Sequence, residues 1–155
     1  MKNLKQAQWA LFWFGLFKIP MIRFTRPRVV EINDSRCVIR IPFRRRTKNH
    51  LGGIYIAAYT IGADLAAGFL AFYLIKKYKL KASIAFKSMS AIYHKRAEEA
   101  VYFTCDAGQQ IMAMIEASKA SGERQNEKIP IPVTVTSEED PVSEIDIELS
   151  LKVLQ

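Results

Sequence analysis

The sequence predicts an α+β domain in which a mostly antiparallel sheet covers one long apolar helix. Residues 54–75 form an apolar run of twenty-two residues that contains a single charge, Asp64. On both sides of this run, apolar and polar residues alternate with a period of two, which is typical of strands with one buried face. We therefore expect the run to be the central helix of a folded core, over about residues 53–77, covered by a curved sheet of about six strands.

The elements follow in a regular order along the chain. A helix is expected over residues 8–17, ending before Pro20, and a hairpin over 29–44 turns at Asn33 and Asp34. After the central helix, two strands near 84–87 and 101–105 read as a pair around the sequence KRAEE. A short helix over 109–121 ends at Gly122, and two strands follow it. Pro130 and Pro132 in the first of these indicate an edge or bulged strand, because proline cannot donate to a sheet.

Composition favours one folded domain over residues 1–155. Half of the residues are hydrophobic, which is enough for a sizeable core. We divide the chain into an N-terminal helix and lead-in, 1–24, and a core, 25–155. Cys37 and Cys105 stand far apart without a CxxC motif, so neither a disulfide framework nor a metal site is expected. A reducing cytoplasm fits this cysteine usage.

Charge is distributed unevenly along the chain, whose formal net charge is +8. Residues 1–50 carry twelve Lys and Arg against two acids, whereas residues 123–155 carry three against eight. Such an asymmetry fits nucleic acid, an anionic membrane surface, a phosphate-bearing ligand, or a subunit whose ends neutralise each other. No recognition motif accompanies the basic half, so we do not expect nucleic-acid binding.

Two apolar segments raise the question of a membrane. The segment WALFWFGLF, 9–17, is too short to span a bilayer, and no small-residue cleavage site follows it. We expect its aromatic residues to pack on the fold or on a partner subunit. The central run is long enough to span, but Asp64 would be costly there and both flanks are basic. The alternating strands around it favour a core helix, so no transmembrane segment is expected.

Asp64 lies on a stripe of small side chains at helical spacing. The stripe contains Gly53, Ala57, Thr60, Asp64, Gly68 and Ala71. The carboxylate therefore faces either a closely packed element, where it would need a basic partner, or a ligand slot. Both a structural ion pair and a catalytic or ligand-binding role remain open. Asn49 and His50, just before the helix, fit either a cap or a site.

The segment RTKNHLGGIYIAAYTIGADLAAG, 46–68, resembles the hot-dog thioesterase superfamily. It is most similar to an uncharacterised bacterial branch of it, a domain of unknown function with an Asn-His-x-Gly entry and a Gly-Ala-acid-Leu-Ala helix. The resemblance covers about residues 26–154. It implies the hot-dog fold, a homodimer or higher homo-oligomer, and hydrolysis of an acyl-CoA or related thioester at a subunit interface. It implies no cofactor apart from the coenzyme A moiety of the substrate.

The resemblance also implies roles for single residues. The His-Gly-Gly turn of the phenylacetyl-CoA thioesterase type would fall on Leu51, Gly52 and Gly53, and the acid position of that type would fall on Thr60. His50 is displaced by one residue, and Asp64 lies one turn beyond Thr60 on the same face. The implied catalytic set is Asp64 as base or nucleophile, the Gly52 N–H as oxyanion donor, Asn49 or His50 orienting substrate or water, and Thr60 bonding the carboxylate. The substrate-binding set is Gly53 with Arg44, Arg45, Arg46 and Lys48. Guanidinium groups bind phosphate bidentately, so this basic cluster fits the phosphates of coenzyme A, and it equally fits a solvated loop.

These departures from the family pattern leave an alternative open, a non-catalytic module that binds an acyl chain or lipid. The spacing adds a geometric condition to the catalytic reading. Twelve residues of helix between Gly52 and Asp64 would measure roughly 18 Å at 1.5 Å per residue. Both groups could therefore meet one thioester only if they came from different subunits.

Overall fold

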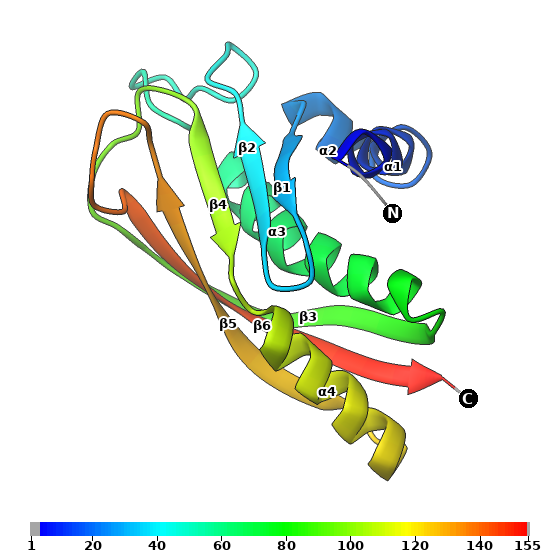
Figure 1. Cartoon of the computed structure of the whole chain (residues 1–155). Coiled ribbons are helices and arrows are strands. Elements are labelled where there is room, and N and C mark those ends of the chain that lie inside the picture. Colours follow the sequence, from blue (N-terminus) through cyan, green and yellow to red (C-terminus); the bar gives the residue numbers. More distant parts are fainter. Residues whose placement is uncertain (1–3, 155) are drawn as a thin grey trace.

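The computed structural model describes residues 4–154, and its strands wrap around one long helix (Figure 1). In chain order the elements are α1 (Leu4–Phe17), α2 (Pro20–Thr25), β1 (Arg28–Ile32), β2 (Cys37–Ile41), α3 (Ile56–Lys77), β3 (Lys81–Tyr93), β4 (Val101–Cys105), α4 (Gly108–Ser121), β5 (Gln125–Thr134) and β6 (Ser143–Leu154). The strands form one sheet in the order β1-β2-β4-β5-β6-β3, and each neighbouring pair is antiparallel. The expected hot-dog architecture is confirmed.

The central helix α3 is held close to the sheet by its small residues. Ala63, Ala66 and Ala71 are fully buried. A Cβ at Gly62 would lie 2.2 Å from the Phe103 ring on β4, so only glycine permits this approach. The helix has the length and hydropathy of a membrane span, but 72% of its most apolar window is buried inside the protein. It is therefore the core helix of the fold, as the alternating strands predicted.

The helix begins at Ile56 and not near residue 53, because the preceding turn is held by bonds to other segments. The N–H of Ile54 donates to the Ala97 carbonyl oxygen at 2.9 Å, and that of Tyr55 donates to the Thr47 oxygen at 2.8 Å. Gly52 adopts a φ of 83°, which a helix cannot accommodate. The entry to α3 is thus an ordered loop rather than a first helical turn.

Strand pairing differs from the expectation in one place. The predicted pair around KRAEE is wrong: β3 pairs with β6, and β4 lies between β2 and β5. The N–H groups of His94 and Lys95 both donate to the Val142 carbonyl oxygen, which directs the chain leaving β3 along β6. Residues 94–100 therefore lead from β3, at one edge of the sheet, past β6 and β5 to β4, instead of closing a hairpin.

The strand with the two prolines, β5, is central and not at an edge. The Val133 carbonyl accepts a hydrogen bond from Val142 on the β6 side. Because backbone direction alternates along a strand, Pro130 and Pro132 face the β4 side. There β4 pairs only with Val133 and Thr134. The missing N–H groups of the prolines thus fall beyond the end of the β4 ladder, where no bond is lost.

The N-terminal helix α1 packs on the fold through one face, but not through its aromatic residues, which we expected to be covered and which stay exposed. Ala7, Leu11 and Gly15 are buried against neighbouring segments. The Gln8 side-chain oxygen accepts the N–H of Val29 at 2.8 Å and so joins α1 to the edge strand β1. Figure 1 shows α1 beside β1 and α2, at the edge of the sheet. Its opposite face remains exposed.

Cys37 and Cys105, distant in sequence, occupy directly paired positions of β2 and β4. Both are free thiols buried in the core. Burial raises the pKa of Cys37 above its ordinary value and the pKa of Cys105 to about 11. Two buried thiols held in the protonated form behave as small core residues.

Candidate active site

Asp64 lines an apolar cavity of about 490 Å³ between α1, α3 and β3. The helix α3 contributes Leu65, Gly68, Phe69 and Phe72 beside Asp64. The wall opposite comes from α1 and the residues just after it, and β3 adds Ile84 and Phe86. Asp64 is the only acid among the lining residues, and Lys18 and Lys76 are the only bases. One carboxylate therefore faces a hydrophobic groove large enough for part of an acyl chain.

The Asp64 carboxylate has no compensating partner in the part of the chain that the structure describes. Among residues 4–154 it accepts no hydrogen bond and forms no ion pair within 4.0 Å. Desolvation by burial raises its pKa above the ordinary value of an aspartate. The ion-pair alternative thus finds no basic partner here. A partly buried carboxylate with a raised pKa suits a general base.

The turn before α3 is organised by Asn49. Its side-chain oxygen accepts the N–H groups of Leu51 and Gly53, both at 3.0 Å. The Gly52 N–H donates to the Asn49 carbonyl oxygen at 3.3 Å. His50 is exposed beside them. Asn49 therefore shapes the loop, and its side-chain oxygen is already occupied twice.

The structure does not bring this turn to Asp64 within one chain. Asp64 lies eight residues into α3 from Ile56, about 12 Å at 1.5 Å per residue. None of Asn49, His50, Gly52, Gly53 and Thr60 lines the Asp64 cavity. The Thr60 hydroxyl donates to the Ile56 carbonyl oxygen at 3.4 Å instead of reaching the carboxylate. Of the predicted catalytic residues, Asp64 alone lies in the groove.

The four basic residues predicted to bind substrate lie on the exposed turn after β2. Arg44, Arg45, Arg46 and Lys48 are exposed, and none forms an ion pair with any residue of 4–154. The Lys48 ammonium lies over the Phe43 ring at 4.2 Å, and the Arg46 guanidinium lies 5.4 Å from the Phe24 ring centroid. These contacts leave their charges available to an anion.

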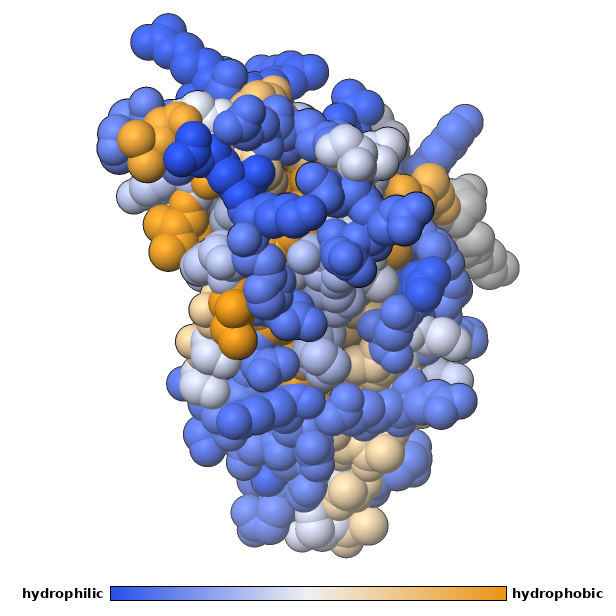
Figure 2. Space-filling view, turned by 90° about the vertical axis from the view of Figure 1, so that its left-hand side faces the viewer, coloured by the Kyte–Doolittle hydropathy of each residue, from blue (hydrophilic) through white to orange (hydrophobic). Residues whose placement is uncertain are grey.

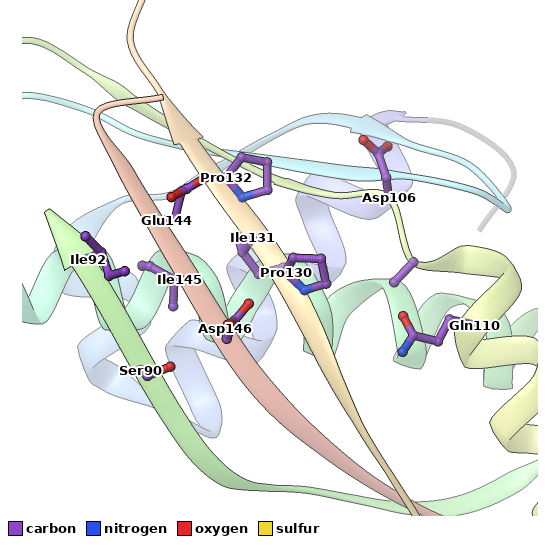
Figure 3. A pocket seen from close by; sticks show the side chains of 11 residues that line it. Ser90, Ile92, Asp106, Gln110, Pro130, Ile131, Pro132, Glu144, Ile145 and Asp146 are labelled. Carbon is purple, nitrogen blue, oxygen red and sulfur yellow. The ribbon is translucent and has the colours of Figure 1, made fainter. Parts of the chain in front are cut away.

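A second hollow, of about 580 Å³, lies on the outer face of the sheet (Figure 3). Its labelled side chains come from β3, β5 and β6, with Asp106 and Gln110 from the β4–α4 region. Two of its three carboxylates are already engaged, Asp106 with Arg36 and Glu144 with His94 at 3.0 Å. The hollow contains none of the predicted site residues. Its acids make it a poor match for a phosphate-bearing substrate.

The part that α1 plays in the groove was missed by reading the sequence. Trp13, Phe14 and Phe17 line the same cavity as Asp64. The repeated aromatic residues between 9 and 17 indicated a surface that needs covering, but not which element they would face.

Within residues 4–154, no group of three or more His, Cys, Asp or Glu side chains is placed to hold a metal ion.

Solved structures with the same architecture include several thioesterases. A protein of unknown function from Pseudomonas aeruginosa, described as a probable thioesterase, is 16% identical with a TM-score of 0.81, and the match covers 98% of this chain and 97% of that one. A mutant thioesterase from the same organism is 12% identical, with a TM-score of 0.73 and coverages of 99% and 96%. A thioesterase from Haemophilus influenzae is 9% identical, with a TM-score of 0.72 and coverages of 99% and 93%.

Because the identities are so low, these structures show that this protein has the same fold and no more. A comparison with curated proteins finds no match for the sequence. A family model does match, over residues 7–151, which is nearly the whole chain. This protein, a hot-dog domain like the thioesterases above, therefore belongs to the family described as a domain of unknown function, DUF4442.

Proposed function

We propose that this protein hydrolyses an acyl-CoA or related thioester in the groove between α1 and α3. The observation that carries the proposal is Asp64, a carboxylate without a partner among the described residues, in the wall of an apolar cavity. Structural neighbours that are described as thioesterases support the same chemistry. The apolar lining would take the acyl chain, and Asp64 would lie near the thioester carbonyl.

In the proposed reaction Asp64 acts as a general base. Its carboxylate takes a proton from water while the oxygen of that water forms a bond to the thioester carbonyl carbon. The tetrahedral oxyanion then collapses, the carbon–sulfur bond breaks, and the proton passes from Asp64 to the leaving thiolate. The products are a carboxylic acid and a free thiol. The raised pKa of Asp64 makes the carboxylate a stronger base than a solvated aspartate.

Oxyanion stabilisation would come from the entry of α3 in a partner subunit. A helix N-terminus offers unpaired N–H groups and a partial positive charge. The Gly52 N–H, our expected donor, is already bonded to Asn49, whereas the N–H groups of Ile56 and Ala57 have no acceptor within residues 4–154. We therefore assign the donor role to Ile56 and Ala57 more readily than to Gly52.

The same proposal requires a homodimer, since the helix entry and Asp64 lie about 12 Å apart in one chain. The outer strand β3 is thirteen residues long and pairs only with β6, so its other edge is open to a second copy.

The phosphates of coenzyme A would bind to the basic turn after β2, through Arg44, Arg45, Arg46 and Lys48. We place the protein in the cytoplasm, in keeping with its free cysteines.

A non-catalytic module that binds an acyl chain is the second candidate. It is favoured by the turn at Asn49, which lacks the His-Gly-Gly sequence of acyl-CoA thioesterases and whose Gly52 N–H is engaged within its own loop. In that case the groove would hold the acyl chain. Asp64 would only contact the polar end of the ligand and so determine how deeply the acyl chain enters.

An Asp64→Asn variant tests the proposed hydrolysis, assayed against a panel of acyl-CoA substrates with detection of the free thiol. The amide keeps the size of the side chain but cannot take a proton, so kcat should fall by roughly 10²- to 10⁴-fold. Asp140→Asn, on an exposed turn, is the matched control and should keep the wild-type rate. Wild-type turnover in the Asp64→Asn variant would remove Asp64 as the base. Binding of acyl-CoA without hydrolysis by the wild type would establish the second candidate.

A further inference from the structure

The two N-terminal helices expose a concentration of large apolar side chains. Half of all exposed large hydrophobic residues in the described chain lie between Leu4 and Phe24. We call six of them the N-terminal aromatic face: Trp9, Phe12, Trp13, Phe17, Met21 and Phe24. Trp9, Phe17 and Met21 are 60%, 70% and 63% exposed. By contrast, the face of the molecule that carries the turns between strands is mostly hydrophilic (Figure 2).

The aromatic residues of α1 are arranged as a continuous ridge on its outward side. Trp9, Trp13 and Phe17 recur every four residues and therefore lie on one side of the helix. The Trp13 ring stacks on Phe17 at 5.2 Å and on Trp9 at 6.2 Å. The opposite side of α1, with Ala7, Leu11 and Gly15, is already buried. The helix is thus apolar on both sides, and its outer ridge needs a covering surface.

Arginines cluster beside this ridge, and the two helices that carry it, α1 and α2, contain no acid. No Asp or Glu occurs before Glu31 in the sequence. Next to Phe12 lies a hollow of about 470 Å³ whose lining includes the arginines Arg23, Arg26, Arg28 and Arg46 and no acid. None of these arginines forms an ion pair with residues 4–154. The Arg23 guanidinium lies 5.4 Å from the Phe12 ring centroid, so cation and aromatic ring meet at the rim.

We propose that the N-terminal aromatic face docks on an anionic phospholipid surface, with the arginine-lined hollow against lipid phosphates. Tryptophan and phenylalanine rings enter the interfacial region of a bilayer, and guanidinium groups bind phosphate oxygens at the same depth. The pairing of an apolar ridge with unneutralised arginines matches both parts of such a surface. The helix α1 would lie in the membrane plane and would not cross it.

The charge distribution favours this occupant over two others. A symmetric contact with a second copy would place the arginines of one chain against those of the other. Nucleic acid would use the arginines but not the ridge, whose rings already stack on each other. A lipid surface uses both. Trp13 and Phe17 also line the Asp64 groove, so docking would bring that groove to the membrane.

Membrane docking does not depend on the proposed hydrolysis, and intrinsic fluorescence tests it directly. The chain has two tryptophans, Trp9 and Trp13, and both lie on the ridge. We expect vesicles of phosphatidylglycerol and phosphatidylcholine to shift their emission to the blue and to co-sediment the full-length protein. Vesicles of phosphatidylcholine alone should bind at least about tenfold more weakly, and binding should weaken as salt increases.

Two double variants separate the contributions while keeping both tryptophans. Arg23→Gln with Arg28→Gln should lower affinity for anionic vesicles by roughly tenfold or more, since each basic group near the surface adds to binding. Met21→Gln with Phe24→Gln should reduce it through lost apolar insertion. Lys119→Gln with Lys128→Gln, and Leu154→Gln, are the matched controls for charge and for exposed apolar area, and should bind as the wild type does.

Three results would overturn the proposal. The first is unchanged tryptophan emission in the presence of anionic vesicles. The second is an emission that depends on protein concentration without lipid, which would assign the ridge to a second copy. The third is equal loss of vesicle binding in the control variants, which would leave only nonspecific attraction by the net positive charge.

Discussion

Asp64 stands out among single residues because its environment disfavours its own charge. The carboxylate is partly desolvated, its pKa is raised, and it receives no hydrogen bond or ion pair among the described residues. A core residue selected only for packing would be apolar at this position, like Leu65 and Phe69 beside it. The sequence pointed to Asp64 because it was the single charge in an apolar run. It could not show that the carboxylate would be left without a basic partner, since that depends on which side chains the fold brings near.

The raised pKa of Asp64 leads to a prediction about stability and pH. The folded protein favours the neutral form of the Asp64 carboxyl, and this preference adds to the free energy of unfolding. The contribution is fully present below the pKa of the unfolded state, about 3.9, and is lost as pH rises through the higher pKa of the folded state. Asp64→Asn removes this loss. Thermal unfolding should therefore show a higher Tm for the variant than for the wild type near neutral pH. The two Tm values should be equal at about pH 3, where the Asp64 carboxyl of the wild type is protonated in both the folded and the unfolded state.

Asp140→Asn, which changes an exposed carboxyl, serves as the control and should not show this pH-dependent difference. A lower Tm for Asp64→Asn near neutral pH would contradict the argument. It would mean that the charged carboxylate has a favourable partner in the assembled protein.

At the scale of elements, the alternating pattern predicted most of the sheet. Residues 37, 39 and 41 of β2 and residues 129, 131 and 133 of β5 are buried as their period of two required. Strand partners were less accessible, because alternation specifies a buried face but not a neighbour. The wrong pairing of β3 with β4 and the central position of β5 both follow from this. Pro130 and Pro132 are tolerated only because β4 ends beside them, which is a tertiary fact.

The basic turn after β2 provides a test of substrate recognition at the scale of one element. If Arg44 and Arg45 hold coenzyme A phosphates, Arg44→Gln with Arg45→Gln should raise KM for acyl-CoA by roughly tenfold and leave kcat unchanged. The same acyl group on a short thiol without phosphates is the control substrate, and its KM should not change. An equal KM increase for both substrates would show that the turn acts on the acyl chain or on folding, and not on the nucleotide.

At the scale of the whole molecule, three exposed features adjoin one another, because α1 and β3 both contribute side chains to the groove of Asp64. The open edge of β3 offers backbone groups, the groove beside α3 offers an apolar slot with one acid, and the α1–α2 surface offers aromatic rings with arginines. A second copy on the β3 edge would bond to backbone groups of β3, which the N-terminal aromatic face does not include, so the two proposed interactions use different groups.

The dimer proposed for the β3 edge can be tested with one backbone substitution. The N–H of His94 donates to Val142 on the β6 side. The Ile92 carbonyl oxygen accepts the side-chain hydroxyl of Ser143, also of β6, at 2.8 Å, so the backbone groups of residues 92 and 94 point toward β6 and those of Ala91 toward the open edge. Ala91→Pro removes an outward donor without touching the β6 ladder. In a two-fold symmetric contact this deletes two equivalent hydrogen bonds, which should raise the dimer Kd by about tenfold or more.

Analytical ultracentrifugation of the wild type should show a dimer, and the Ala91→Pro variant should shift toward monomer while its far-ultraviolet circular dichroism is retained. Ile92→Pro is the matched control for the inward side. It interrupts the β6 ladder, so it should lower the unfolding temperature as well as any association. A wild-type protein that sediments as a monomer at all concentrations would contradict the β3 contact. It would also remove the route by which Asp64 of one chain meets the α3 entry of another, because about 12 Å separates the two within a single chain.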